Sequence, residues 1–89
     1  MRAVGLGGLD VLVCNVGGEV LAYADRCPHL GGRLSEGRFD GEVITCAAHE
    51  WCFDARSGGG VNPRRASLAA FPVRVSGDDV FVDLSSAAP

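Results

Sequence analysis

Cys27-Pro28-His29-Leu30-Gly31 and its later counterpart, Cys46-Ala47-Ala48-His49-Glu50-Trp51, are the stretches on which the fold depends. The chain has 2 histidines, and each closely follows a cysteine, as Cys-x-His in the first stretch and Cys-x-x-His in the second. Thiolate and imidazole groups are common protein ligands of zinc and of iron–sulfur centres. The spacing therefore predicts one metal centre that joins both stretches, with the ligands Cys27, His29, Cys46 and His49. The alternative is that the cysteines pack in the core and the histidines lie on the surface.

The mixed ligand pairs bear on the kind of metal centre. A structural zinc site usually pairs like ligands, with two cysteines on one side and two histidines on the other. Here each loop supplies one cysteine and one histidine, which suits a [2Fe-2S] centre with two cysteines on one iron and two histidines on the other. At these residues the chain resembles the Rieske family, whose pattern is Cys-x-His, a spacer of similar length, then Cys-x-x-His. The resemblance implies one Rieske-type [2Fe-2S] cluster, and zinc is the alternative.

The resemblance extends from Cys27 to Val82. It includes the motifs C-P-H-L-G-x-x-L-S-E-G, V-I-T-C-x-A-H-x-W-x-F-D, N-P and F-P-V-x-V-x-G-D-D-V-F-V. These are similar to the soluble Rieske ferredoxins of bacterial oxygenase systems. The likeness is greatest to the ferredoxin component of toluene-type diiron monooxygenases, and next to those of ring-hydroxylating dioxygenases. By this resemblance, further residues are expected to surround the cluster, namely Leu30, Gly31, Ala48, Trp51 and Pro63.

The resemblance also implies a function and two partners. In such systems an NAD(P)H-dependent flavin reductase passes single electrons through the Rieske protein to a separate terminal oxygenase. The chain is then an electron carrier and not itself an enzyme, in a system that acts on aromatic compounds or alkenes. The sequence offers no histidine beyond the two ligands that could act as a general base. Two other functions stay open, a Rieske-like small subunit of a nitrite reductase and a structural zinc-binding module.

Residues around the second histidine indicate a low reduction potential. High-potential members of the family carry a serine two residues beyond that histidine and a tyrosine four beyond, and these hydroxyl groups stabilise the reduced state. Here those positions hold Trp51 and Phe53, and the positions of the family's disulfide hold Gly32 and Ala48. We therefore expect a potential near the bottom of the Rieske range, roughly −150 mV. Glu50 stands where many relatives have glycine.

Length and composition describe one small soluble domain. The chain has 89 residues, of which 47% are hydrophobic and 21% charged, and its formal net charge is −3. No basic stripe indicates a nucleic-acid partner, and no apolar run approaches the length of a membrane span. The N-terminus lacks the pattern of a signal peptide. We expect a monomer in the cytoplasm.

The hydrophobic pattern predicts an all-β fold, a small antiparallel sandwich or open barrel. Gly17-Gly18 and Asp40-Gly41 are hairpin signals, whereas residues 1–8 and 61–67 are expected to be irregular. We expect one domain over residues 1–89, with a cluster-binding subdomain of about residues 26–60 made of the two ligand loops. Short strands are expected at Leu9 to Val16, Glu19 to Ala24, Val43 to Thr45, Trp51 to Asp54, Phe71 to Val75 and Val80 to Asp83.

Three further expectations concern the core and the edges of the fold. The valines at 73, 75, 80 and 82 should form one face of a half-buried hairpin. Cys14 and Cys52 should both pack as small apolar residues, although a disulfide between them stays open. The resemblance implies a longer segment before Leu9 that includes a strand closing the base. Either that edge strand is lost or replaced, or the chain is truncated, or its start codon is misplaced.

Overall fold

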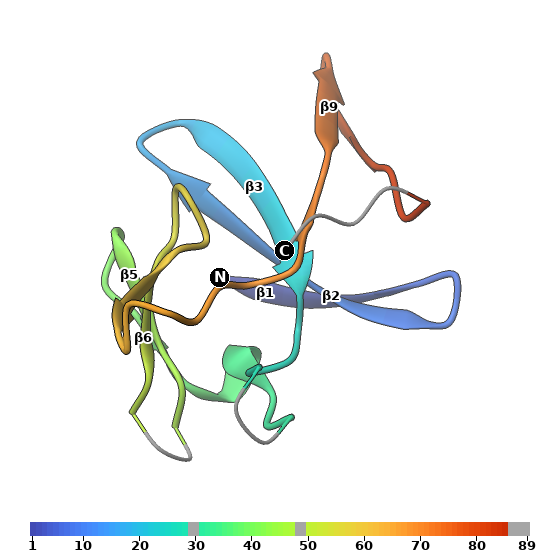
Figure 1. Ribbon diagram of the computed structural model, residues 1–89. Coiled ribbons are helices and arrows are strands. Elements are labelled where there is room, and N and C mark those ends of the chain that lie inside the picture. The colour runs from blue at the N-terminus through green and yellow to red at the C-terminus, as the bar shows by residue number, and fades with distance from the viewer. Residues whose placement is uncertain (29–30, 48–49, 86–89) are drawn as a thin grey trace.

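The computed structural model describes residues 1–28, 31–47 and 50–85, which are built almost wholly from antiparallel strands (Figure 1). The expected all-β antiparallel fold is confirmed. No helix in these three ranges is long and apolar enough to cross a membrane. The elements, in chain order, are β1 (Arg2–Leu6), β2 (Leu9–Val16), β3 (Glu19–Ala24), the 3-10 turn η1 (Leu34–Glu36), β4 (Arg38–Phe39), β5 (Val43–Thr45), β6 (Cys52–Asp54), β7 (Gly60–Asn62), β8 (Ala70–Phe71), β9 (Val73–Ser76) and β10 (Asp79–Val82).

The base sheet has the strand order β1-β2-β3-β8. The expectation that residues 1–8 are irregular is wrong, because β1 pairs with β2 along its whole length, from Arg2 opposite Val13 to Leu6 opposite Leu9. The glycines that suggested a loose lead-in are Gly7 and Gly8, and they form the turn of this hairpin with φ values of 55° and 82°. Only glycine adopts such angles without steric cost, so the turn needs this pair.

The second sheet has the strand order β4-β5-β6-β7 and carries the region of the two ligand stretches. The expected hairpin at Asp40 joins β4 to β5. The Asp40 Oδ1 atom accepts bonds from the backbone N–H of Glu42 at 2.9 Å and of Val43 at 2.8 Å. These bonds stabilise the charged form and lower the pKa of that carboxyl group. β7 lies partly in residues 61–67, so the expectation of an irregular segment there is wrong at its start.

The predicted strand at residues 71–75 is two strands in two sheets. Pro72 lacks a backbone N–H and lies between them, so that β8 pairs with β3 whereas β9 pairs with β10. In Figure 1 the β9–β10 hairpin projects from the rest of the molecule. Val75 is 54% exposed and Val80 45% exposed, so the expected half-buried hairpin face is wrong at these two positions.

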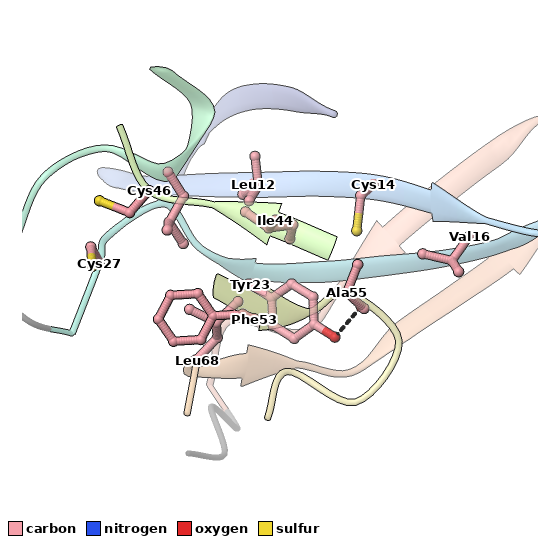
Figure 2. Packing of buried hydrophobic residues seen from close by; sticks show 11 residues of the cluster. Leu12, Cys14, Val16, Tyr23, Cys27, Ile44, Cys46, Phe53, Ala55 and Leu68 are labelled. Atoms are coloured by element: carbon pink, nitrogen blue, oxygen red, sulfur yellow. Dashed lines mark hydrogen bonds between the residues drawn. The ribbon is translucent and has the colours of Figure 1, made fainter. Parts of the chain in front are cut away.

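The base sheet has buried residues on both of its faces. Alternate residues of β2 and β3 belong to two different apolar clusters, as the side-chain period of a strand requires. Val11 and Ala22 pack with Phe71 in the smaller cluster, together with partly buried residues of β9 and β10. The larger cluster lies between the base sheet and the second sheet (Figure 2). It contains Leu12, Cys14, Val16, Tyr23, Cys27, Leu34, Ile44, Cys46, Phe53, Ala55 and Leu68.

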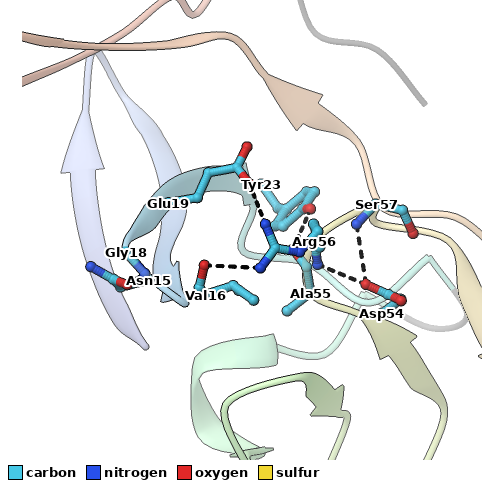
Figure 3. A network of polar contacts seen from close by, with 9 residues as sticks. All are labelled: Asn15, Val16, Gly18, Glu19, Tyr23, Asp54, Ala55, Arg56 and Ser57. Atoms are coloured by element: carbon cyan, nitrogen blue, oxygen red, sulfur yellow. Dashed lines mark hydrogen bonds and ion pairs between the residues drawn. The ribbon is translucent and has the colours of Figure 1, made fainter.

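Polar contacts join the base sheet to the turn that follows β6 (Figure 3). The buried Tyr23 hydroxyl of β3 donates a hydrogen bond of 2.5 Å to the carbonyl oxygen of Ala55. On the surface, the Arg56 guanidinium forms an ion pair with Glu19 and donates to the carbonyl oxygen of Val16 at 3.2 Å. The tyrosine bond is the buried member of this set, so we expect it to contribute most to holding the two sheets together.

Replacing Tyr23 by phenylalanine should make stability less dependent on alkaline pH. Burial raises the pKa of Tyr23 to about 12, against about 10 in an unfolded chain. The neutral hydroxyl therefore stabilises the fold fully below pH 10, and this stabilisation is lost as the pH rises through 12. We expect Y23F to lower the free energy of unfolding at pH 7 by about 1–2 kcal/mol and the difference from wild type to shrink above pH 10. Urea unfolding across this range measures it, and a difference independent of pH would contradict it.

Candidate metal centre

The two predicted cysteine ligands lie at one end of the larger apolar cluster (Figure 2). Cys27 follows β3 and Cys46 follows β5, and their side chains are adjacent in that view. Cys27 is 2% exposed and Cys46 1% exposed. The structure thus brings together the two thiols that the sequence assigns to one centre. The other predicted ligands and two neighbours, His29, His49, Leu30 and Ala48, lie outside the described residues.

The two cysteine turns have the same backbone hydrogen bonds. In the first, the Cys27 N–H donates to the Gly32 carbonyl at 2.7 Å, and the Gly31 N–H donates back to the Cys27 carbonyl at 2.9 Å. In the second, the Cys46 N–H donates to the Trp51 carbonyl at 2.8 Å, and the Glu50 N–H donates back to the Cys46 carbonyl at 2.9 Å. Both cysteines are therefore held by turns of the same span and the same bonding. Such a pair of turns presents two thiols in equivalent settings.

Both turns also need a left-handed residue four positions after the cysteine. Gly31 has φ 78° and Glu50 has φ 55°, and Glu50 is the one non-glycine residue with positive φ in the described part of the chain. A side chain in this region costs roughly 1–2 kcal/mol, so this backbone conformation favours glycine. The Glu50 carboxylate meets Arg38 at 3.3 Å in an exposed ion pair. An exposed pair contributes only about 0–1 kcal/mol, so it does not offset the backbone strain.

A comparison of Glu50→Gly with Glu50→Ala should isolate this strain. Both variants remove the carboxylate and its ion pair, and they differ in whether a Cβ atom is present at positive φ. We expect E50G to be more stable than E50A by about 1 kcal/mol. Thermal unfolding of the two variants, compared at equal cluster content, measures the difference. An E50A variant as stable as E50G would show that the turn does not hold residue 50 in the left-handed region.

A buried carboxylate beside the first turn was not singled out from the sequence. The Asp25 side chain is fully buried at the end of β3 and accepts bonds from the Ser35 N–H at 2.8 Å and the Ser35 hydroxyl at 2.6 Å. Arg33 donates to the same carboxylate at 3.4 Å and reaches Asp10 at 3.5 Å. This network fixes η1 against the strand that leads into Cys27. The sequence signal for this network was a charged residue, Asp25, at a position that the alternation of side chains along β3 makes buried.

Trp51 closes the second turn, Phe53 lies in β6 directly after it, and Pro63 follows β7. Phe53 is fully buried, whereas Trp51 is half-buried and packs against the larger cluster. Pro63 is half-buried beyond β7, and the guanidinium of Arg65 lies 5.9 Å from the centre of the Trp51 ring. The aromatic residues thus supply apolar surface, without a hydroxyl group, next to the cysteine turn.

The remaining cysteines are not joined to each other. Cys14 is a buried free thiol in the larger cluster, and burial raises its pKa. Cys52 is a half-buried free thiol whose Sγ atom lies 3.4 Å from the Glu50 carbonyl oxygen and 3.6 Å from the Thr45 hydroxyl. The disulfide between them that the sequence left open is therefore absent. Cys14 packs in the core as expected, whereas Cys52 is half-buried and belongs to neither apolar cluster.

The donor chemistry of this end of the core fits an iron–sulfur centre. Thiolate ligands select iron–sulfur clusters, zinc and cuprous ion, and here two thiols come from matching turns at the edge of an apolar cluster. Apolar surroundings limit solvent access to such a centre. The two thiols that a mixed cysteine and histidine ligand set would need thus lie at one end of the described core.

This chain belongs to the Rieske [2Fe-2S] domain family, whose model matches residues 1–72. The cofactor that this membership implies is one Rieske-type [2Fe-2S] cluster. The match includes both cysteine stretches and the whole of the second sheet. The family resemblance stated from the sequence is confirmed.

Two curated relatives are ferredoxin components of oxygenase systems. The ferredoxin component of biphenyl 2,3-dioxygenase from Rhodococcus jostii (strain RHA1) is 44% identical over 79 residues, which are 88% of this chain and 74% of that protein. The ferredoxin component of the alkene monooxygenase system of Xanthobacter autotrophicus (strain ATCC BAA-1158 / Py2) is 38% identical over 84 residues, which are 92% of this chain and 68% of that protein. Relatives thus occur in dioxygenase and in monooxygenase systems, both of which the sequence resemblance included.

Two solved structures from carbazole 1,9a-dioxygenase systems are similar to this chain in fold. The ferredoxin of carbazole 1,9a-dioxygenase from Nocardioides aromaticivorans IC177 matches with a TM-score of 0.80 and 31% identity, covering 91% of this chain and 81% of that one. A complex of reduced oxygenase and oxidized ferredoxin in carbazole 1,9a-dioxygenase contains a chain with TM-score 0.80 and 35% identity, covering 91% of this chain and 77% of that one. The structural similarity therefore agrees with the family to which the sequence match assigns this chain.

Proposed function

We propose that this chain is the low-potential Rieske ferredoxin of an oxygenase system. It carries single electrons from an NAD(P)H-dependent flavin reductase to a terminal oxygenase that acts on aromatic compounds or alkenes. The observation that supports this most is the pair of buried cysteines, Cys27 and Cys46, on turns with the same backbone bonding. The relatives in biphenyl dioxygenase and alkene monooxygenase systems support the choice of partner class.

The ligand assignment is part of the proposal. Cys27 and Cys46 bind one iron through their thiolates, and His29 and His49 bind the other through their imidazoles. When bound, the cluster supplies reversible uptake of one electron. The protein's contribution is to hold both cysteines in fixed turns, since each turn is closed by two backbone bonds. The proposal includes one domain over residues 1–89, in which a subdomain of about residues 26–60 surrounds the cluster and the remainder forms the base.

The residues near the second turn support a low potential. Hydroxyl groups that donate to cluster sulfur stabilise the reduced state and raise the potential. Phe53 is fully buried and Trp51 is half-buried, and neither side chain carries a hydroxyl group. We therefore propose a potential near the bottom of the Rieske range, roughly −150 mV. Such a carrier accepts electrons from a flavin and acts as a monomer in the cytoplasm.

Spectroscopy of the purified protein tests this function. We expect a brown protein with one [2Fe-2S] cluster per chain, bleached by dithionite, whose reduced form gives a rhombic EPR signal. A redox titration should show one electron per chain. A protein that stays colourless after anaerobic reconstitution with iron and sulfide, and that binds zinc instead, would overturn the proposal.

A further inference from the structure

We propose that Asp25 helps to set the reduction potential, and that its buried negative charge holds this potential low. The inference rests on the proposed function, because it concerns the cluster that Cys27 and Cys46 bind there. Asp25 is not a ligand in that site, and it lies two residues before Cys27 in the chain. Its effect on the cluster is therefore electrostatic.

The Asp25 carboxylate is removed from solvent and held in one place. Its side chain is 0% exposed. It accepts hydrogen bonds from the Ser35 N–H at 2.8 Å, from the Ser35 hydroxyl at 2.6 Å and from the Arg33 Nε atom at 3.4 Å. All three partners donate, which suits the acceptor-only chemistry of a carboxylate. Bonds from residues 33–35 therefore give this negative charge a fixed position next to the first cysteine turn.

Both Asp25 and Cys27 are buried, so the charge interaction between them is weakly screened. Cys27 is 2% exposed, and the Asp25 side chain is fully buried. Two residues of chain span at most about 7 Å, so the carboxylate and the Cys27 thiolate lie on the order of 10 Å apart. Reduction adds one negative charge to the cluster, and a fixed negative charge nearby opposes it. At an effective dielectric constant of about 20, one unit charge at this distance changes the equilibrium constant for reduction on the order of tenfold.

The cations beside the first turn are more exposed than the Asp25 carboxylate. Arg33, its ion-pair partner, is 46% exposed and is shared with Asp10 at 3.5 Å. Arg26 is also exposed, and its Nε atom lies 3.2 Å from the position that a Cβ atom on Gly31 would take. Water and salt weaken the field of an exposed charge more than that of a buried one. These cations therefore reduce the effect of Asp25 without cancelling it.

Glu50 beside the second turn provides a matched comparison. It directly follows His49 in the chain, and its carboxylate is paired with Arg38 at 3.3 Å, as that of Asp25 is paired with Arg33. The Glu50 side chain is 75% exposed, however, and that of Arg38 is 70% exposed. The two carboxylates thus differ chiefly in burial. If burial decides the effect, neutralising Asp25 changes the potential more than neutralising Glu50 does.

Redox titration of the D25N and E50Q holoproteins tests this inference. D25N removes the charge and keeps an oxygen atom that accepts the Ser35 N–H. We expect it to raise the equilibrium constant for reduction about tenfold, which is about 59 mV for a one-electron couple, and E50Q to change it about twofold or less. The D25N shift should persist in about 1 M salt, where the Debye length is about 3 Å. Equal shifts in the two variants, or a D25N potential at or below that of the wild type, would overturn the inference.

A second variant, R33Q, separates charge from structure and serves even where D25N does not retain its cluster. It keeps the carboxylate and removes the cation, so we expect a potential below that of the wild type, opposite in sign to the D25N shift. A purely structural role predicts that both variants loosen the first turn, which hydrogen exchange of the Ser35 amide records, and that neither sign is preferred. An R33Q potential at or above that of the wild type would overturn the inference. A wild-type protein without a reducible cluster would overturn the proposed function instead.

Discussion

Replacing Cys46 by alanine is expected to give a colourless protein with no Rieske EPR signal and no electron transfer. Cys46 is almost fully buried and is held in its turn by two backbone bonds, so no other residue can take its place as a ligand. C27A should behave in the same way. Because the cluster joins both turns in the proposed site, its loss should also lower the unfolding temperature. Absorption, iron and sulfide analysis and thermal unfolding measure these effects together.

The other two cysteines provide the control. Cys14 packs in the core and Cys52 contacts Thr45 and the Glu50 carbonyl, so C14A and C52A should keep the cluster and its spectrum. C14A removes one buried sulfur and should cost on the order of 1 kcal/mol by leaving a small cavity. If C52A lost its cluster while C46A stayed brown, the ligand assignment would be wrong. H29A and H49A should lose the spectrum as C46A does.

Much of the fold was predictable from local patterns. The hairpin of β2 and β3 and the turn at Asp40 follow from glycine-containing turn signals between alternating apolar residues. Both were found at the expected residues. Turn chemistry and side-chain alternation are properties of neighbouring residues, so they can be read without knowing the tertiary structure.

The wrong predictions concern segments whose structure or burial depends on tertiary packing. The segment Arg2–Leu6 is a strand because β2 offers it a pairing edge, and a glycine-rich segment alone does not reveal that edge. The valines of β9 and β10 alternate as in a half-buried sheet, but Val75 and Val80 face solvent because little of the described chain covers them. Alternation indicates which residues share a face, and burial depends on what lies opposite.

The candidate site likewise has features that the sequence predicted and features that it did not. Cysteine and histidine spacing identified the two turns, because metal ligands are rare residues placed close together in sequence. The Asp25 network and the left-handed Glu50 were not predicted. Asp25 acts through Ser35, which lies on another element. Positive φ at a glutamate has no signal in the residues around it.

Replacing Gly37 by alanine is expected to destabilise the second sheet and to impair cluster retention. Gly37 ends η1 with φ −89°, so its conformation does not require glycine. The requirement is steric, because a Cβ atom there would overlap the Thr45 carbonyl oxygen and would lie 3.1 Å from the Ala47 nitrogen. These are backbone atoms on either side of Cys46, and they cannot rotate away. We expect a loss of about 3 kcal/mol of unfolding free energy, at the upper end for overpacking.

Gly5→Ala is the matched control for this steric effect. Gly5 lies in β1, and nothing is within 4 Å of its added Cβ atom. Alanine is favoured over glycine inside a strand by roughly 0.5–1 kcal/mol, so G5A should be as stable as the wild type or slightly more stable. Displacement of the Thr45 and Ala47 backbone carries Cys46 with it, so G37A should release its cluster at a lower temperature than G5A does. Visible absorption during heating records that release. Equal cluster retention in the two variants would show that the backbone around Cys46 yields to the extra atom without moving the thiolate.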